Sequence, residues 1–152
     1  MQALEKSQNS STFDDVVALS GDDLLAVDKL ISTSLQSDVA LVSQVSEYIV
    51  MSGGKRLRPV IVLLAARAFG YTGEQHIRAA AIIEFIHTAT LLHDDVVDSS
   101  SRRRGQDSAN TVFGNQASVL VGDFLYSRAF QMMVAIDSMR IMQILADRKS
   151  VV

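Results

Sequence analysis

Residues 74–97 constrain the fold more than any other part of the sequence. This segment contains no proline or glycine, and a nearly continuous apolar block lies between Ala79 and Leu92. The whole chain of 152 residues is 48% apolar, with one proline and eight glycines, so residues that break regular structure are scarce. We predict one long buried helix over 74–97, within an all-α helical bundle that forms a single domain over residues 13–146.

Apolar periodicity predicts further helices on both sides of this segment. Residues 13–35 follow a helical pattern that is broken near Gly21, and Asp38 is a candidate N-cap for the next helix. Gly53 and Gly54 end that helix, and Pro59 suits the first turn of its successor. The other expectations are a disordered leader over 1–12, a buried helix over 58–69 that is apolar almost all round, a polar loop over 99–107, a helix over 115–136 and a last helix from about 138.

Charge, cysteine content and hydropathy exclude several classes of protein. The net charge of −3 argues against a general nucleic-acid binder, and the absence of cysteine excludes disulfides and thiolate metal sites. Residues 1–12 lack the apolar stretch of a signal peptide, and no apolar run approaches the roughly 18 residues that span a bilayer. We therefore expect a cytoplasmic protein with no membrane span and no nucleic-acid partner.

Three aspartates at the end of the long helix are the main chemical feature. Asp94 and Asp98 are four residues apart and share a helix face, with Asp95 beside them. Crowded carboxylates at a helix C-terminus repel each other, and the negative end of the helix dipole disfavours them further. A bound cation would neutralise this charge. Oxygen ligands without cysteine favour Mg²⁺, which commonly also binds substrate phosphates. The alternative is a solvated acidic helix end.

A basic, glycine-containing segment precedes the long helix. In GGKRLRP, residues 53–59, the glycines allow backbone amides to approach a ligand, and the next helix directs its positive end toward the same place. Lys55 and Arg58 can both reach a phosphate there. The alternative is a simple turn with exposed basic side chains.

Arg103 and Arg104 follow the aspartates in a loop that can fold over a metal-bound diphosphate. Plain salt bridges to the aspartates are the alternative for this pair. His87 lies two turns before Asp94 on the same face, as a ligand-binding side chain or as a satisfied core histidine.

Four segments together resemble the trans-polyprenyl diphosphate synthases, and the bacterial long-chain members most of all. These segments are GGKRLRP at 53–59, EFIHTATLLHDDVVD at 84–98, RRG at 103–105 and FGNQASVLVGDFLY at 113–126. The resemblance covers about residues 15–146 and implies an isoprenoid-synthase-type helical bundle, here truncated. It also implies an Mg²⁺-dependent prenyltransferase that condenses isopentenyl diphosphate with an allylic diphosphate.

The resemblance assigns roles to particular residues. Asp94, Asp95 and Asp98 match the first aspartate-rich motif, which holds Mg²⁺ and through it the allylic diphosphate, with Asp94 and Asp98 as the direct ligands. The resemblance implies four catalytic residues, which are the three aspartates of this motif and Arg103. The positions that bind isopentenyl diphosphate in the family correspond to Lys55, Arg58, His87 and Arg104. The position that contacts the allylic diphosphate corresponds to Arg103.

The implied chemistry is ionisation of the allylic diphosphate, followed by attack of the isopentenyl double bond and loss of a proton. Ala89 and Thr90 are small where shorter-chain members tend to place an aromatic residue, and Ile86 lies deeper along the same path. We therefore expect a long all-trans product, of the kind used for quinone side chains. Close helix packing is the alternative reason for the small residues.

The chain also departs from the family pattern. A second aspartate-rich motif is absent, because Asp123 and Asp137 are too isolated to form one. Residues 147–152 do not look like the helix with which family members continue here, and GATCGGAAGAGCGTCGTG, which matches a common sequencing adapter, can encode them. We therefore expect a non-native tail, a fragment that is inactive alone, and a homodimer when the protein has its full length.

Two other functions remain open at this point. A His-Asp metal phosphohydrolase would use His93 with His76 and His87, but it leaves the basic segment and the arginine pair unexplained. The second alternative is a non-catalytic partner subunit that binds either diphosphates or a full-length synthase.

Overall fold

The computed structural model describes residues 13–51 and 54–146, with side chains for 15–49 and 54–146. The predicted leader (1–12), Gly53 and the predicted tail (147–152) lie outside the described residues. The described elements are α1 (Phe13–Ala18), α2 (Gly21–Ser34), α3 (Ala40–Met51), α4 (Leu57–Ala68), α5 (Gln75–Val97), β1 (Arg102–Arg103), β2 (Gln106–Asp107), α6 (Ala109–Phe113), α7 (Asn115–Val134) and α8 (Met139–Ala146).

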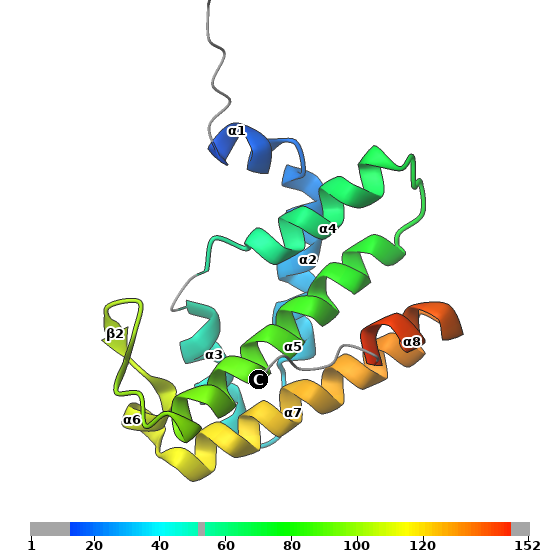
Figure 1. The fold of residues 1–152 in the computed structure, drawn as a ribbon. Helices are drawn as coiled ribbons and strands as arrows, with labels where there is room; N and C mark the ends of the chain where they lie inside the picture. Colours follow the sequence, from blue (N-terminus) through cyan, green and yellow to red (C-terminus); the bar gives the residue numbers. More distant parts are fainter. Residues whose placement is uncertain (1–12, 52–53, 147–152) are drawn as a thin grey trace, which may run out of the picture.

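The long helix α5 lies at the centre of the bundle, as its apolar block predicts. It packs along α7, which runs in the opposite direction beside it, and against α4 and α2 (Figure 1). The helix α3 packs against α7 and α6, and α8 follows the end of α7. Within residues 13–51 and 54–146, every helix is too short or too polar to span a bilayer.

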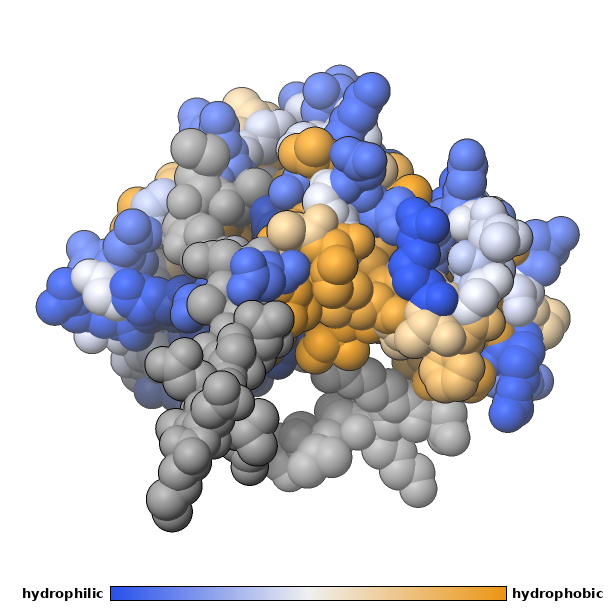
Figure 2. All heavy atoms as spheres, turned by 90° about the horizontal axis from the view of Figure 1, so that it is seen from above, coloured by the Kyte–Doolittle hydropathy of each residue, from blue (hydrophilic) through white to orange (hydrophobic). Residues whose placement is uncertain are grey.

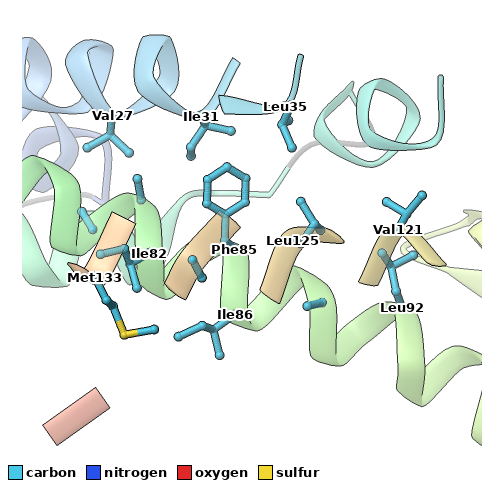
Figure 3. Packing of buried hydrophobic residues seen from close by; sticks show 14 of the residues in the cluster. Val27, Ile31, Leu35, Ile82, Phe85, Ile86, Leu92, Val121, Leu125 and Met133 are labelled. Carbon is cyan, nitrogen blue, oxygen red and sulfur yellow. The ribbon is translucent and has the colours of Figure 1, made fainter. Parts of the chain in front are cut away.

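One hydrophobic cluster joins α2, α5 and α7. Phe85 of α5 points toward Ile31 and Leu35 of α2, whereas Ile86 points to the side of α5 away from α2 (Figure 3). Small residues let the two long helices approach closely, because Ala89 and Ala129 are fully buried. Burial of each large aliphatic side chain in this cluster stabilises the fold by roughly 1.5–3 kcal/mol.

The expectation that α4 is buried was wrong for its outer face. Val60 and Leu63 are buried, but Leu57 and Ile61 on the outer face are more than half exposed. In the described part of the chain, α4 packs mainly against α5 and α2, and its opposite face is exposed. Seen from above, the molecule presents an apolar patch near the centre of its surface, bordered by hydrophilic residues (Figure 2).

The segment expected to be a polar loop, 99–107, contains a short antiparallel hairpin. Arg102 pairs with Asp107 and Arg103 with Gln106, and the two residues between the strands are Arg104 and Gly105. Both have positive φ, 51° and 81°, as a two-residue hairpin turn requires. The following one-turn helix α6 was not predicted, because five residues are too few to show a helical period.

The expected break near Gly21 is confirmed, since α1 ends at Ala18 and α2 begins at Gly21. Asp38 is not the N-cap of α3, because the Val39 carbonyl accepts the hydrogen bond from the Ser43 amide. Ser37 provides the polar contact instead, and its Oγ accepts from the Val39 N–H. In the folded loop, Ser37 and not Asp38 lies within hydrogen-bond distance of the Val39 N–H.

A charged cluster joins α2, α4 and α5 near the start of α5, at the opposite end of this helix from Asp94, Asp95 and Asp98. Asp23 Oδ2 accepts hydrogen bonds from Arg67 Nη2 at 2.7 Å and Arg67 Nε at 2.9 Å, and lies 3.1 Å from His76 Nε2. Burial alone raises the pKa of Asp23, but hydrogen bonds from Arg67 and His76 outweigh it and lower that pKa. The ionised form of Asp23 is therefore the form that stabilises the fold.

The substitution Asp23→Asn should lower the free energy of unfolding at neutral pH, because it removes the negative charge that both partners bind. A lowered pKa in the folded state gives stability that is present above the ordinary value of 3.8 and is lost as the pH falls below it. Denaturant unfolding at a series of pH values should therefore show the difference between the two proteins shrinking in acid. Asp22→Asn, an exposed change in the same first helical turn, is the matched control and should have little effect.

Candidate functional site

The basic loop before α4 is shaped by a residue in an unusual backbone conformation. Arg56 is the N-cap of α4 and has φ 49° and ψ 30°, a left-handed geometry that costs a non-glycine residue about 1–2 kcal/mol. Its carbonyl accepts the first helical hydrogen bond of α4, from the Val60 N–H at 3.0 Å. Lys55 and Arg58 flank this turn and are exposed.

A hollow beside this loop brings the four residues predicted to bind isopentenyl diphosphate together. Lys55 and Arg58 line it from the loop, His87 from α5 and Arg104 from the hairpin turn. The remaining lining residues of this hollow are Gly54, Arg56, Leu57 and Glu84. The hollow is rich in basic groups, which is the chemistry that binds a phosphate or diphosphate.

The acidic end of α5 divides its aspartates between two environments. Asp94 and Asp98 are exposed, whereas Asp95 is 4% exposed. Asp95 accepts a forked pair of hydrogen bonds from Arg103: Nε lies 2.9 Å from Oδ2, and Nη2 lies 2.7 Å from Oδ1. Among the described residues, no three histidine, aspartate or glutamate side chains converge as a metal site.

Arg103 feels the charge of the whole acidic motif. Its hydrogen bonds to Asp95 raise the pKa of the guanidinium, burial opposes this, and the charges of Asp95, Asp94 and Asp98 raise it further. The guanidinium therefore remains charged beside the exposed carboxylates. An anion bound between Arg103 and the exposed carboxylates would contact the guanidinium directly. A metal ion could link the same anion to the aspartates.

The hairpin turn lies close to the basic loop, although fifty residues separate them in sequence. The Arg104 guanidinium lies against Gly54, where an added Cβ would be 2.9 Å from Nη1 and would displace the end of that side chain. A second hollow extends from there along α5. It shares Gly54, Arg56, Glu84, His87 and Arg104 with the first, and it reaches Asp95 and Arg103. The basic loop and the acidic helix end therefore open onto adjoining spaces.

The residues expected to set product length lie on α5 between these two ends. Ala89 is fully buried and Ile86 is 9% exposed, and both belong to the hydrophobic cluster. Thr90 is half-buried, and its hydroxyl donates to the His87 carbonyl at 2.7 Å. Their part in product length stays a prediction.

The three histidines lie apart. His76 binds Asp23 at the start of α5, and His87 lines the basic hollow. His93 faces α7, where its Nε2 is 3.4 Å from Asp123 Oδ1 and its ring packs over Gly122 so tightly that a Cβ there would clash. This arrangement gives no support to a His-Asp metal phosphohydrolase, which needs histidines that converge.

Sequence reasoning missed two residues of the site. It selected Lys55 and Arg58 from the basic segment but gave no role to Arg56, which donates to Asp28 Oδ1 and Glu84 Oε1, each at 3.0 Å. Glu84 itself was quoted only within a motif. The available signal was that Glu84 is a lone acid within the apolar block of the long helix.

The fold is all-α, its charged groups line two adjoining hollows, and comparison with known proteins identifies the family. The family model for polyprenyl synthetase matches residues 39–151. Octaprenyl diphosphate synthase of Escherichia coli is 54% identical over 134 residues, which are 88% of this chain. All-trans-nonaprenyl-diphosphate synthase (geranyl-diphosphate specific) of Rhodobacter capsulatus is 52% identical over 126 residues, which are 82% of this chain. The chain belongs to the polyprenyl synthetase family.

The likeness extends to three dimensions but not to full length. A polyprenyl synthase from Caulobacter crescentus, solved with calcium and isoprenyl diphosphate, matches 91% of this chain with a TM-score of 0.86 and 47% identity. The chain spans 42% of that structure and of the E. coli relative, and 39% of the R. capsulatus relative. The predicted resemblance to bacterial long-chain trans-polyprenyl diphosphate synthases is thus confirmed for an amino-terminal part of these proteins.

The division among the aspartates predicts opposite effects on stability in metal-free buffer. Asp95→Asn should lower the free energy of unfolding by about 1–3 kcal/mol, because it weakens a charged hydrogen-bonded pair. Asp94→Asn and Asp98→Asn should be neutral or slightly stabilising, since each removes a like charge at a helix C-terminus. Chemical denaturation of the three variants measures this, and equal effects at all three positions would contradict the division.

Proposed function

We propose that this chain is the amino-terminal part of an Mg²⁺-dependent trans-prenyltransferase, which joins isopentenyl diphosphate to an allylic diphosphate and makes a long-chain product. One observation carries the proposal. Lys55, Arg58, His87 and Arg104 line one basic hollow, and an adjoining space leads to Asp95 and Arg103 at the acidic end of α5. Two diphosphates need two such neighbouring sites.

The donor set at the end of α5 suits magnesium. Asp94 and Asp98 are exposed carboxylates one turn apart, while Asp95 is engaged with Arg103. Magnesium is usually held by one or two carboxylates together with substrate phosphates, so Asp94 and Asp98 are the ligands we propose. When bound, the ion supplies positive charge that stabilises the departing diphosphate. We assign Asp95 to the positioning of Arg103, in place of the metal ligation expected from the sequence.

The basic residues act by binding and orientation. Arg103 is held by Asp95 at the side of the acidic motif, where it can bind the allylic diphosphate as its carbon–oxygen bond breaks. Lys55, Arg58, His87 and Arg104 hold the isopentenyl diphosphate so that its double bond faces the reacting carbon. The apolar residues of α5 beside them, such as Leu91 and Leu92, exclude water from that space.

The length of the relatives bears on the activity of this chain. Because the chain spans 42% of the E. coli relative, we propose that residues 1–152 alone lack part of the metal site and are inactive.

We also propose a homodimer for the full-length protein, since α7 presents Leu120, Phe130 and Val134 at half exposure or more. The same partial coverage leaves a second candidate function, a non-catalytic partner subunit that binds diphosphates or a full-length synthase.

The test joins residues 1–146 to the remaining, carboxy-terminal part of E. coli octaprenyl diphosphate synthase. The chimera should incorporate labelled isopentenyl diphosphate when Mg²⁺ is present and stop when EDTA is added. Asp94→Ala and Asp98→Ala should each lower kcat by about 100-fold or more, because the charge that stabilises the leaving group is lost. Asp38→Ala, an exposed change on the loop before α3, is the control.

Undiminished turnover in both aspartate variants would refute this assignment. A chimera that never turns over, while the unmodified chain changes the rate of a full-length synthase when the two are mixed, would favour the partner-subunit function.

Product length provides a separate test of the α5 residues. Thr90→Phe in the chimera should shorten the main product by one or more five-carbon units, because a half-buried position can accept an aromatic ring that blocks the proposed path. Chromatography of the dephosphorylated products measures the length. An unchanged product distribution would count against a path along this face of α5.

A further inference from the structure

Arg56 stands out in the basic loop because its side chain binds two carboxylates of other helices. Its Nη1 donates to Oε1 of Glu84 on α5 at 3.0 Å, and its Nε donates to Oδ1 of Asp28 on α2 at 3.0 Å. The Arg56 and Glu84 side chains are 18% and 12% exposed, whereas Asp28 is 45% exposed. The pair with Glu84 is thus the shielded part of this network, and solvent screens it less.

The backbone at Arg56 needs such an anchor. Its left-handed φ of 49° is unfavourable for a residue with a side chain, and it turns the chain into the first turn of α4. Lys55 lies immediately before this turn and Arg58 two residues after it, and both line the basic hollow. Displacement of Arg56 would therefore move both of these basic groups.

Glu84 connects the loop to the other side of the hollow. It lies one helical turn before His87 on α5, and both residues line the hollow. A hydrogen bond from Arg56 to Glu84 therefore fixes the spacing between two basic groups of the loop and the histidine that faces them.

We infer that the Arg56–Glu84 pair is a positioning device for the isopentenyl diphosphate site, with Asp28 as its outer support. This inference rests on the proposed function for the identity of the anion. The pair sets the distance between the basic loop and α5, and Lys55, Arg58 and His87 then meet the diphosphate without rearrangement.

Electrostatics and positioning predict opposite signs for one substitution. Glu84 is a carboxylate on the wall of an anion site, so its charge alone opposes diphosphate binding. If charge were its only effect, Glu84→Gln would tighten binding. If Glu84 holds Arg56 in place, the same change weakens binding.

The experiment measures binding of isopentenyl diphosphate to the chimera by titration calorimetry, without an allylic substrate so that no reaction occurs. Arg56→Gln and Glu84→Gln should each raise Kd about tenfold, as expected for a lost charged hydrogen bond that positions a ligand group. The double variant should bind no more weakly than the weaker single variant, because both changes break one interaction. Glu74→Gln, an exposed change at the start of the same helix, is the control.

Kinetics separate positioning from general damage. In an active chimera, KM for isopentenyl diphosphate should rise about tenfold in both variants, while KM for the allylic substrate and kcat change less than twofold. If a variant melts below the assay temperature, Asp28→Asn is the milder change in the same network, and it should raise Kd about two- to threefold.

Several results would overturn the inference. Unchanged or tighter binding by Glu84→Gln would remove the positioning role, and additive effects of the two changes would indicate that Arg56 touches the anion directly. A chimera that binds isopentenyl diphosphate but does not turn over would overturn the proposed function alone, and Kd would still decide the inference. An unsubstituted chimera that binds no isopentenyl diphosphate would overturn both.

Discussion

The close packing of α5 against α7, α4 and α2 determines where the charged groups of the site lie. Those groups sit on α5 itself or on loops that reach it, and a helix buried along most of its length cannot rotate or slide without opening the core. Small residues on both helices, including Ala89, Ala129 and Gly122, let α5 and α7 approach closely. The tight core therefore holds Glu84, His87 and Asp95 in fixed relative positions.

The same electrostatic device occurs twice along α5. Glu84 and Asp95 are the more shielded carboxylates, they are separated by about three helical turns, and so they share a helix face. Each binds an arginine from a loop: Arg56 from the loop before α4, and Arg103 from the hairpin after α5. In both places the paired groups are partly shielded while their neighbours in sequence stay exposed, namely Lys55 and Arg58, or Asp94 and Asp98. In the function that we propose, the shielded pairs fix the geometry and the exposed neighbours supply the charge that binds a ligand.

Much of the fold follows from local sequence signals. The apolar block and the absence of breakers predicted the long helix to within one residue of its observed start, Gln75, and at its observed end, Val97. The errors arose where the outcome depends on neighbours that are remote in sequence. The helix α4 looks buried from its composition, yet its outer face is exposed in the described chain. The hairpin at 102–107 and the short α6 carry too few residues for a periodic signal.

The sequence by itself determined the all-α class and the family, because these depend on local periodicity and on motifs of a few residues. It also predicted which residue types would carry the proposed chemistry. Only the tertiary structure decided which of two neighbouring charged residues forms a shielded ion pair and which stays exposed. Asp94 and Asp95 are adjacent and chemically identical, as are the guanidinium groups of Arg56 and Arg58, and no local rule distinguishes them. Their environments differ because a helix buries one face and exposes another, and because loops distant in sequence bring partners to the buried groups alone.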